Sequence, residues 1–359
     1  MPDSAAKSDR ATAAEIVLPC AAIPETLSFF TDELGFRVDS IYPADAPRVA
    51  VISGFGVRLR LDREASGDPA TVRLIGSDFS AAATRRAPNG TRVEFVPAEA
   101  SLALPENSPS LVVLKAADGP GWGTGRAGMQ YRDLIPDRYG GRFIASHIRI
   151  AHGGPVPDYV HHHHIHFQMI YCVNGWVRVV YEDQGPPMLM EAGDCFLQPP
   201  HIRHRVLECS DRMEVVEFAC PAEHETRVDH DMQLPTTVLA ADRVFDGQRF
   251  VFHRAEGAAW RPWHADGFEF RDTRIGAATN GVATVVVVRA SAAAGALNLD
   301  HEAEIRFLFV LRGSASLHCD DAERGELVAN DAAAIPPGLQ CSLTDISPDF
   351  EFLEVTLPA

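Results

Sequence analysis

The chain has 359 residues, of which 46% are hydrophobic and 23% charged, a composition typical of globular proteins with sizeable cores. Its net charge of −17 argues against a nucleic-acid partner, because binding to phosphates requires a basic face. No apolar run reaches the roughly 18 residues that a membrane span needs, so we expect no membrane partner.

The N-terminal residues 1–14 are polar and lack an apolar signal core, so we expect a disordered lead. Seven cysteines are dispersed along the chain without a C-x-x-C pair. This usage is typical of reduced thiols in the cytoplasm, where we expect the protein to reside. We therefore predict that each cysteine is a small, buried, apolar side chain.

Residues 15–97 predict a small α+β module. A strand (15–20) precedes a helix that Pro24 opens and Gly35 ends. Strand-like runs follow at 37–43, 48–54, 57–62, 71–76 and 91–97. The β-α-β-β-β order resembles one unit of the vicinal oxygen chelate (glyoxalase) superfamily, most closely over residues 15–62. That family builds its metal site from two units, and the first strand here carries Glu15 and no histidine. We therefore expect a structural or dimer-forming module.

Residues 98–126 predict a connector rich in Pro, Gly and Ser, with one strand-like run at 110–116. The segment 123–128 matches G-x-G-x-x-G. A dinucleotide-binding fingerprint should follow a strand and open an amphipathic helix, and neither flanks this segment. We predict a glycine-rich linker there.

From residue 140 the chain is almost entirely β. Short apolar runs separated by turn residues form two consecutive units, 127–235 and 236–359, which suggests paired barrels or sandwiches. The dipeptide Asn174–Gly175 stands between two such runs and predicts a two-residue hairpin. The predicted fold class is mainly β, with two barrels after the α+β module.

The run of histidines at 161–164 raises the question of a metal site. Residues two apart in a strand share a face, so His161 and His163 point one way and His162 and His164 the other. Only one pair can line a barrel interior. A metal also needs a ligand from a neighbouring strand, and Gln168 and His204 are candidates.

These residues resemble the two motifs of the cupin superfamily of β-barrels. The first motif's spacing is matched by His161, His163, Gln168 and Gly175, and the second motif's by Gly193, Pro199, His201 and His204, with His201 at a glycine position. The resemblance implies the metal ligands His161, His163, Gln168 and His204. The pair His162 and His164 also fits a shorter spacing to Gln168, so His162, His164 and His201 remain alternative ligands or neighbours of the ligands.

The implied cofactor is one divalent transition metal per chain, and iron, manganese, nickel, copper and zinc all suit such ligands. Glutamine replaces the family's glutamate at Gln168, which leaves the site more positive by one charge. The amide either ligates through its oxygen or hydrogen-bonds a bound water or substrate. A metal-free polar barrel mouth is the alternative interpretation.

The second barrel lacks most of this set. His301 stands at the first ligand position, but Ala303, Arg306 and Cys341 occupy the others. We predict a degenerate barrel retained for structure or dimerisation. Together the two halves resemble a bicupin over residues 127–359.

The resemblance implies a metal-dependent enzyme, and we favour a dioxygenase that acts on a small organic substrate, anionic or aromatic. The alternatives are a non-catalytic small-molecule-binding protein and a metal-dependent isomerase or lyase that uses no oxygen. We expect the protein to form a homodimer. We also expect this small-molecule substrate to be its binding partner.

Overall fold

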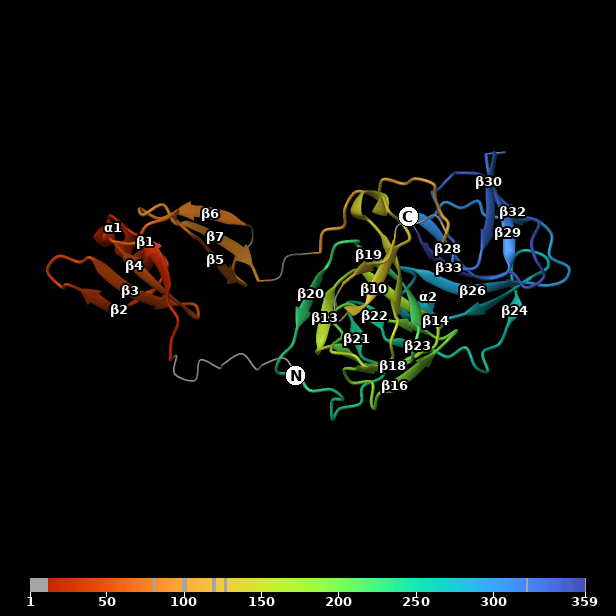
Figure 1. Ribbon diagram of the computed structural model, residues 1–359, viewed down its shortest axis with the longest axis horizontal. Helices are drawn as coiled ribbons and strands as arrows, with labels where there is room; N and C mark the ends of the chain where they lie inside the picture. The colour runs from red at the N-terminus through yellow and green to blue at the C-terminus, as the bar shows by residue number, and fades with distance from the viewer. Residues whose placement is uncertain are drawn as a thin grey trace. The chain divides into compact units, whose positions relative to one another are not determined.

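The computed structural model describes residues 12–79, 82–98, 102–117, 121–125, 128–320 and 322–358. It divides the chain into two compact units, Met1–Ser101 and Leu102–Ala359 (Figure 1). The predicted fold class is confirmed, because strands dominate and the α-helices are short. None of the helices in the described part of the chain has the length and hydrophobicity that a membrane span needs.

The N-terminal unit has the predicted β-α-β-β-β order. Its elements are β1 (Ile16–Pro19), α1 (Ile23–Ser28), a π-helical turn (Phe29–Glu33), β2 (Arg37–Tyr42), β3 (Val49–Gly54) and β4 (Val57–Asp62). These strands form a sheet in the order β1-β4-β3-β2, and Phe30 from the helical segment packs with Ile52 and Leu59 from the sheet. Strands β5 (Thr71–Gly76), β6 (Ala83–Arg86) and β7 (Arg92–Pro97) form a second sheet.

The first barrel is built from two sheets, with strand orders β23-β17-β14-β19-β11-β10-β9 and β16-β15-β18-β13-β20. Their bounds are β9 (Gly123–Thr124), β10 (Gln130–Asp133), β11 (Ile144–Ile150), β12 (Gly154–Pro155, beside β18), β13 (His161–His164), β14 (Phe167–Asn174), β15 (Trp176–Tyr181), β16 (Met188–Glu191), β17 (Cys195–Leu197), β18 (His204–Cys209), β19 (Met213–Cys220), β20 (Glu225–Val228) and β23 (Val251–His253). A 3₁₀ turn (Arg138–Gly141) and the ribbon of β21 (Val244–Phe245) and β22 (Gln248–Arg249) complete this part.

The second barrel repeats this plan, with strand orders β24-β25-β26-β33-β28-β31-β8 and β27-β32-β29-β30. Its elements are β8 (Val112–Leu114), β24 (Arg261–Pro262), β25 (Phe268–Asp272), α2 (Ile275–Ala278), β26 (Thr284–Ala290), β27 (Leu297–Asn298), β28 (Ile305–Arg312), β29 (Ser314–Cys319), β30 (Ala322–Val328), β31 (Ala332–Ile335), β32 (Cys341–Thr344) and β33 (Glu351–Leu357). Two strands belong to a barrel whose other strands lie elsewhere in the sequence. Strand β8 pairs with β31 of the second barrel, and β23 pairs with β17 of the first barrel.

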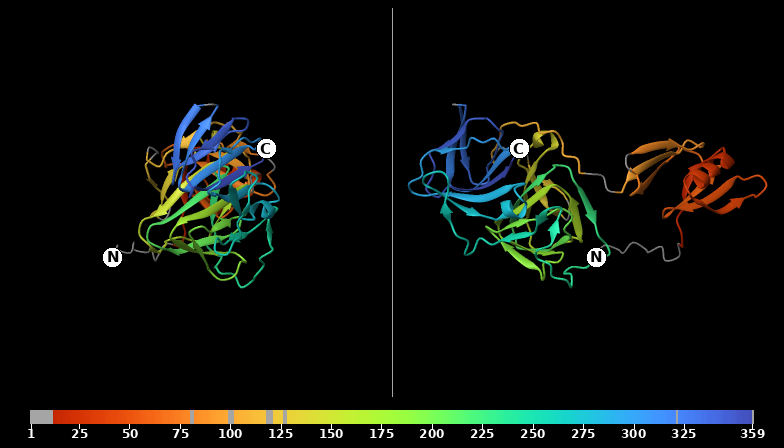
Figure 2. Two further views of the ribbon diagram at one scale, coloured as in Figure 1. Left: turned by 90° about the vertical axis from the view of Figure 1, so that its right-hand side faces the viewer. Right: turned by 180° about the vertical axis from the view of Figure 1, so that it is seen from behind.

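The two barrels share one hydrophobic core, and they lie side by side in Figure 1 and in the right-hand view of Figure 2. Phe167 and Phe218 of the first barrel pack in this core with Phe307 and Phe309 of the second. The alternate side chains of the same strands point into each barrel's own interior, as Val215 and Leu308 do. Because both faces of these strands are buried, their sequences show only partial alternation.

The predicted hairpin at Asn174–Gly175 is wrong. Strand β14 pairs with β17 and β19, whereas β15 pairs with β16 and β18 in the other sheet. Gly175 has a φ of 73°, a left-handed conformation that glycine adopts without strain, and a Cβ there would clash with the Ser210 hydroxyl oxygen. The dipeptide therefore carries the chain between two sheets.

The prediction of seven unpaired cysteines is also wrong. Cys20, Cys172, Cys195, Cys209 and Cys220 are buried and free, as expected, but Cys319 and Cys341 form a disulfide. The two lie directly opposite each other on the neighbouring strands β29 and β32. This pairing brings together residues 22 apart in sequence, which spacing along the chain does not reveal.

Candidate metal centre

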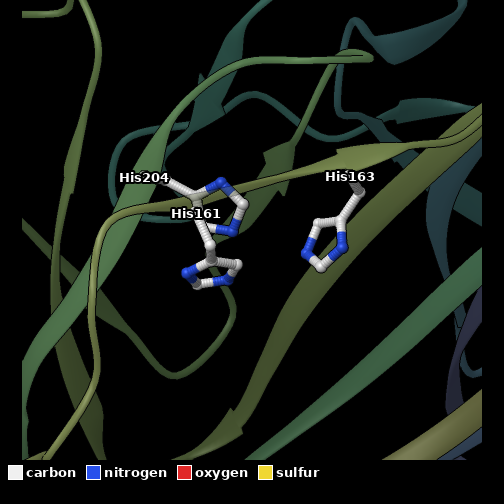
Figure 3. A group of neighbouring side chains, drawn as sticks. All are labelled: His161, His163 and His204. Carbon is white, nitrogen blue, oxygen red and sulfur yellow. The ribbon is translucent and has the colours of Figure 1, made fainter. Parts of the chain in front are cut away.

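Three histidines come together inside the first barrel. His161 and His163 lie on β13, and His204 lies on the adjacent strand β18, directly opposite His161. One ring nitrogen from each of the three lies within 4.8 Å of the others. Their ring centroids are 4.2–5.3 Å apart, and Figure 3 shows the grouped rings. This group could hold a metal ion.

The alternating histidines of the same strand lie elsewhere. His161 and His163 line the interior cavity, whereas His162, His164 and His201 are not among its lining residues. The ring of His201 stacks on that of His164, with centroids 5.2 Å apart, and its Nε2 lies 3.2 Å from the Asp246 carboxylate. Burial, reinforced by the nearby Arg203 guanidinium, lowers the pKa of His162 to about 4. The alternative ligand pair thus lies outside the cavity, near His201.

Backbone carbonyls set the protonation of two rings. The Nδ1 atoms of His161 and His204 lie 2.8 and 3.0 Å from the carbonyl oxygens of Tyr159 and Ile202. A carbonyl only accepts hydrogen bonds, so each Nδ1 carries the proton and each Nε2 keeps a lone pair. Metal-binding histidines commonly make this hydrogen bond behind the ligating nitrogen, so the donor set fits a transition metal.

A chain of hydrogen bonds links the histidines to side chains that the sequence motifs did not single out. The Tyr181 hydroxyl donates to Gln198 Oε1 (2.9 Å), and Gln198 Nε2 lies 3.1 Å from His204 Nε2. Gln198 Nε2 also contacts Gln168 Oε1 (3.4 Å), and Gln168 Nε2 donates to Glu217 Oε1 (2.9 Å). Burial raises the pKa of Tyr181 well above its usual value, which keeps its hydroxyl protonated as a donor.

Gln168 therefore lines the cavity and is linked to His204 through Gln198. Gln198, Glu217 and Tyr181 were missed by the sequence analysis because none of them stands at a position that either motif specifies. A signal was nonetheless present: Gln198 lies two residues beyond the inward-facing Phe196, and Glu217 two beyond the inward-facing Val215. A polar residue at an inward position of an apolar strand is a candidate site residue.

The cavity is small and mostly apolar, with a volume of about 90 Å³. That space holds several water-sized groups, since each needs about 10–15 Å³ on this scale. A small organic molecule therefore fits beside the histidines. The apolar lining consists of Met129, Ile148, Ile170, Val177, Val179, Met190, Phe196, Val206, Met213 and Val215.

The backbone supports the motif alignment in both barrels. Gly193 and His201, at the two glycine positions of the second motif, have φ values of 97° and 64°. Their counterparts in the second barrel, Asn330 and Gly338, have φ values of 70° and 73°. A left-handed backbone conformation favours glycine at these positions. The conformation is the same where His201 and Asn330 stand in place of glycine.

In the second barrel, the positions that correspond to the candidate metal ligands hold side chains of other kinds. Arg306 pairs with Glu354 at 2.8 Å, both side chains being 8% exposed. Cys341, at the position of His204, is bonded to Cys319. The remaining histidine, His301, donates from Nε2 to the Ile335 carbonyl oxygen (3.0 Å). A guanidinium and a disulfide cannot ligate a metal, so the positions of this half that correspond to the ligand set offer one imidazole at most.

We expect that replacing His301 by alanine leaves the metal content of the purified protein unchanged, because the corresponding positions of that barrel hold Ala303, Arg306 and the disulfide-bonded Cys341. Elemental analysis of wild type and variant checks this. A wild-type content near two metal ions per chain, halved by His301→Ala, would contradict the interpretation of a degenerate barrel.

Comparison with known proteins bears on the fold. No protein-family model matches the sequence, and no curated protein matches it. Among solved structures, a deletion mutant of Bacillus subtilis oxalate decarboxylase is 13% identical, with a TM-score of 0.50 over 70% of this chain and 77% of that chain. The two-barrel fold of this chain is similar to that of this oxalate decarboxylase, which is a bicupin. A second oxalate decarboxylase structure gives 14% identity, a TM-score of 0.50 and the same coverage, while protein YlbA from E. coli gives 11%, 0.49, and 72% and 94%. At these identities the bicupin likeness concerns the fold alone.

Proposed function

We propose that this bicupin is a metal-dependent enzyme whose active barrel uses His161, His163 and His204 to bind one divalent metal ion. The observation that carries the proposal is the grouping of three ring nitrogens within 4.8 Å in a largely apolar cavity. Gln168, which lines the same cavity, is the fourth candidate ligand through Oε1. Iron or manganese would suit three nitrogens and one oxygen, as would the other metals named above.

The reaction that we favour is the oxygen-dependent cleavage of a small organic substrate. A metal ion held by these neutral imidazoles and the amide would supply Lewis-acid chemistry, polarising an anionic or phenolic oxygen of the substrate. The apolar lining excludes water and fits an aromatic or aliphatic body. Tyr181 and Gln198 form the hydrogen-bonded polar part of this cavity, and they would orient the substrate's oxygen atoms.

Metal analysis combined with an oxygen electrode separates this proposal from its rivals. Protein purified without a His tag is assayed for metal, then supplied with small aromatic and aliphatic acids. Oxygen uptake that depends on substrate and metal supports a dioxygenase. Turnover without oxygen uptake favours an isomerase or lyase, a class that would include decarboxylases such as the oxalate decarboxylases named above. Binding of small molecules without metal favours a non-catalytic binding protein.

For the N-terminal unit we infer a glyoxalase-like module that forms a homodimer. Its edge strand β2 is exposed along its length, and Val38, Ile41 and Tyr42 leave apolar side chains on it that are 44%, 38% and 67% exposed. An exposed apolar edge strand is a ready pairing surface. Light scattering of the full chain should then give twice the monomer mass, and a monomer at micromolar concentration would refute the inference.

A further inference from the structure

Glu217 is the one acidic side chain among the described residues that line the first barrel's cavity. It lies on β19, opposite Ile170 of β14, so Gln168 is its diagonal neighbour across the two strands. Neighbours of this kind are within reach of long side chains, and Gln168 Nε2 donates to Glu217 Oε1 at 2.9 Å. Glu217 therefore contacts a candidate ligand from inside the barrel.

This contact fixes which way the amide of Gln168 points. A carboxylate only accepts hydrogen bonds, so the NH₂ group of Gln168 must face Glu217 and its oxygen must face the other way. That oxygen lies 3.4 Å from Gln198 Nε2, which is itself 3.1 Å from His204 Nε2. Glu217 thereby directs the Gln168 oxygen toward Gln198 Nε2, the atom that also contacts His204.

The second barrel repeats the arrangement with a permanent cation. Glu354 of β33 lies opposite Leu308 of β28, just as Glu217 lies opposite Ile170. Arg306 corresponds to Gln168 in this register, and its guanidinium pairs with Glu354 at 2.8 Å. In both barrels a carboxylate therefore occupies the same inward strand position. In the second barrel a buried positive charge lies against it.

Charge balance gives the first-barrel carboxylate a corresponding role. Three neutral imidazoles and an amide leave a divalent ion uncompensated, and bringing a charge into an apolar cavity is costly unless an opposite charge accompanies it. Asp158 lies behind His161, with Oδ1 3.8 Å from Nδ1, and is not part of the cavity lining. Glu217 is the anion on the cavity side.

We propose that Glu217 is a positioning residue for the metal centre. Through Gln168 it supplies the negative charge that a ligating carboxylate would otherwise supply, and it aims the Gln168 oxygen at the metal. The inference rests on the proposed metal centre and adds to it the residue that sets the charge of the centre. The negative charge therefore lies on Glu217, one side chain further from the metal than a ligating carboxylate at position 168 would place it.

The test is a charge exchange, with Co²⁺ as the probe and its visible absorption as the readout. Glu217→Gln keeps the shape of the side chain and removes the charge, and it should weaken Co²⁺ binding by roughly 10- to 100-fold. The double variant Gln168→Glu with Glu217→Gln restores both the charge and a hydrogen bond between the two positions. It should recover affinity to within about threefold of wild type, with a changed Co²⁺ spectrum because a carboxylate now ligates.

Glu354→Gln is the matched control, since it removes the corresponding charge from the second barrel. It should leave Co²⁺ affinity unchanged even if the melting temperature falls. Two results would overturn the role of Glu217. One is a Co²⁺ affinity of Glu217→Gln within about twofold of wild type, and the other is a double variant whose Co²⁺ affinity is as low as that of Glu217→Gln. If Glu217→Gln does not fold, the double variant decides by the same criterion. A wild-type protein that binds no Co²⁺ would instead refute the metal centre itself.

Discussion

Replacing His161, His163 or His204 by alanine is expected to remove most of the bound metal. Each side chain supplies one of only three imidazole ligands, and the three nitrogens lie within 4.8 Å of one another. Losing a ligand should weaken binding by more than about 100-fold, since loss of a mere partner behind a ligand costs about 10- to 100-fold. Elemental analysis and isothermal titration with Mn²⁺ would measure the effect.

The chain provides its own controls for this experiment. His162 and His164 belong to the same strand, alternate with the proposed ligands and are not among the residues lining the cavity. Alanine at either position should leave metal content and affinity unchanged. The reverse outcome, in which the His162 and His164 variants lose metal while the His161 and His163 variants keep it, would show that the other face of the strand binds the metal.

Breaking the ion pair between Arg306 and Glu354 is expected to have the largest effect on stability. Both side chains are 8% exposed, and removing one partner leaves the other charge buried and unpaired. Such a loss costs about 3–5 kcal/mol, so Arg306→Met should lower the free energy of unfolding by that amount. Replacing both residues, by Met and Leu, should be much less destabilising because no lone charge remains.

The pair between Arg178 and Glu208 is the matched control for stability. Its atoms are 2.6 Å apart, but the side chains are 39% and 40% exposed. Water screens an exposed pair, so Arg178→Met should cost at most about 1 kcal/mol. Urea denaturation followed by circular dichroism measures all three variants. Equal losses for Arg306→Met and Arg178→Met would show that burial does not set the strength of the Arg306 pair.

Much of the fold was predictable because it depends on local patterns. Pro24 and Gly35 mark the ends of the helical segment of the N-terminal unit, and the helix is confirmed there. Turn residues divided the rest into short strands, which are confirmed as β structure. The hairpin at Asn174–Gly175 failed because a turn dipeptide specifies a local bend, whereas the sheet that each strand joins is decided by distant partners.

In the candidate site, too, local patterns were predictable from the sequence, whereas contacts between distant strands were not. Strand periodicity separated His161 and His163 from their neighbours but could not say which pair faces inward. That depends on the pairing of β13 with β18 and β20, strands that lie far along the chain. Glu217 is 49 residues from Gln168 and meets it only because β14 and β19 pair. The disulfide of Cys319 arises in the same way from the register of β29 and β32.

The central claim is that one metal ion binds in the first barrel, between His161, His163 and His204. A crystal of the full chain, purified without a His tag and supplied with Mn²⁺, should be measured at a wavelength that gives anomalous scattering from the metal. We expect one anomalous peak per chain, within ligating distance of those three rings. A peak beside His164 and His201 on the other side of β13, a peak in the second barrel, or no peak at all would contradict the account.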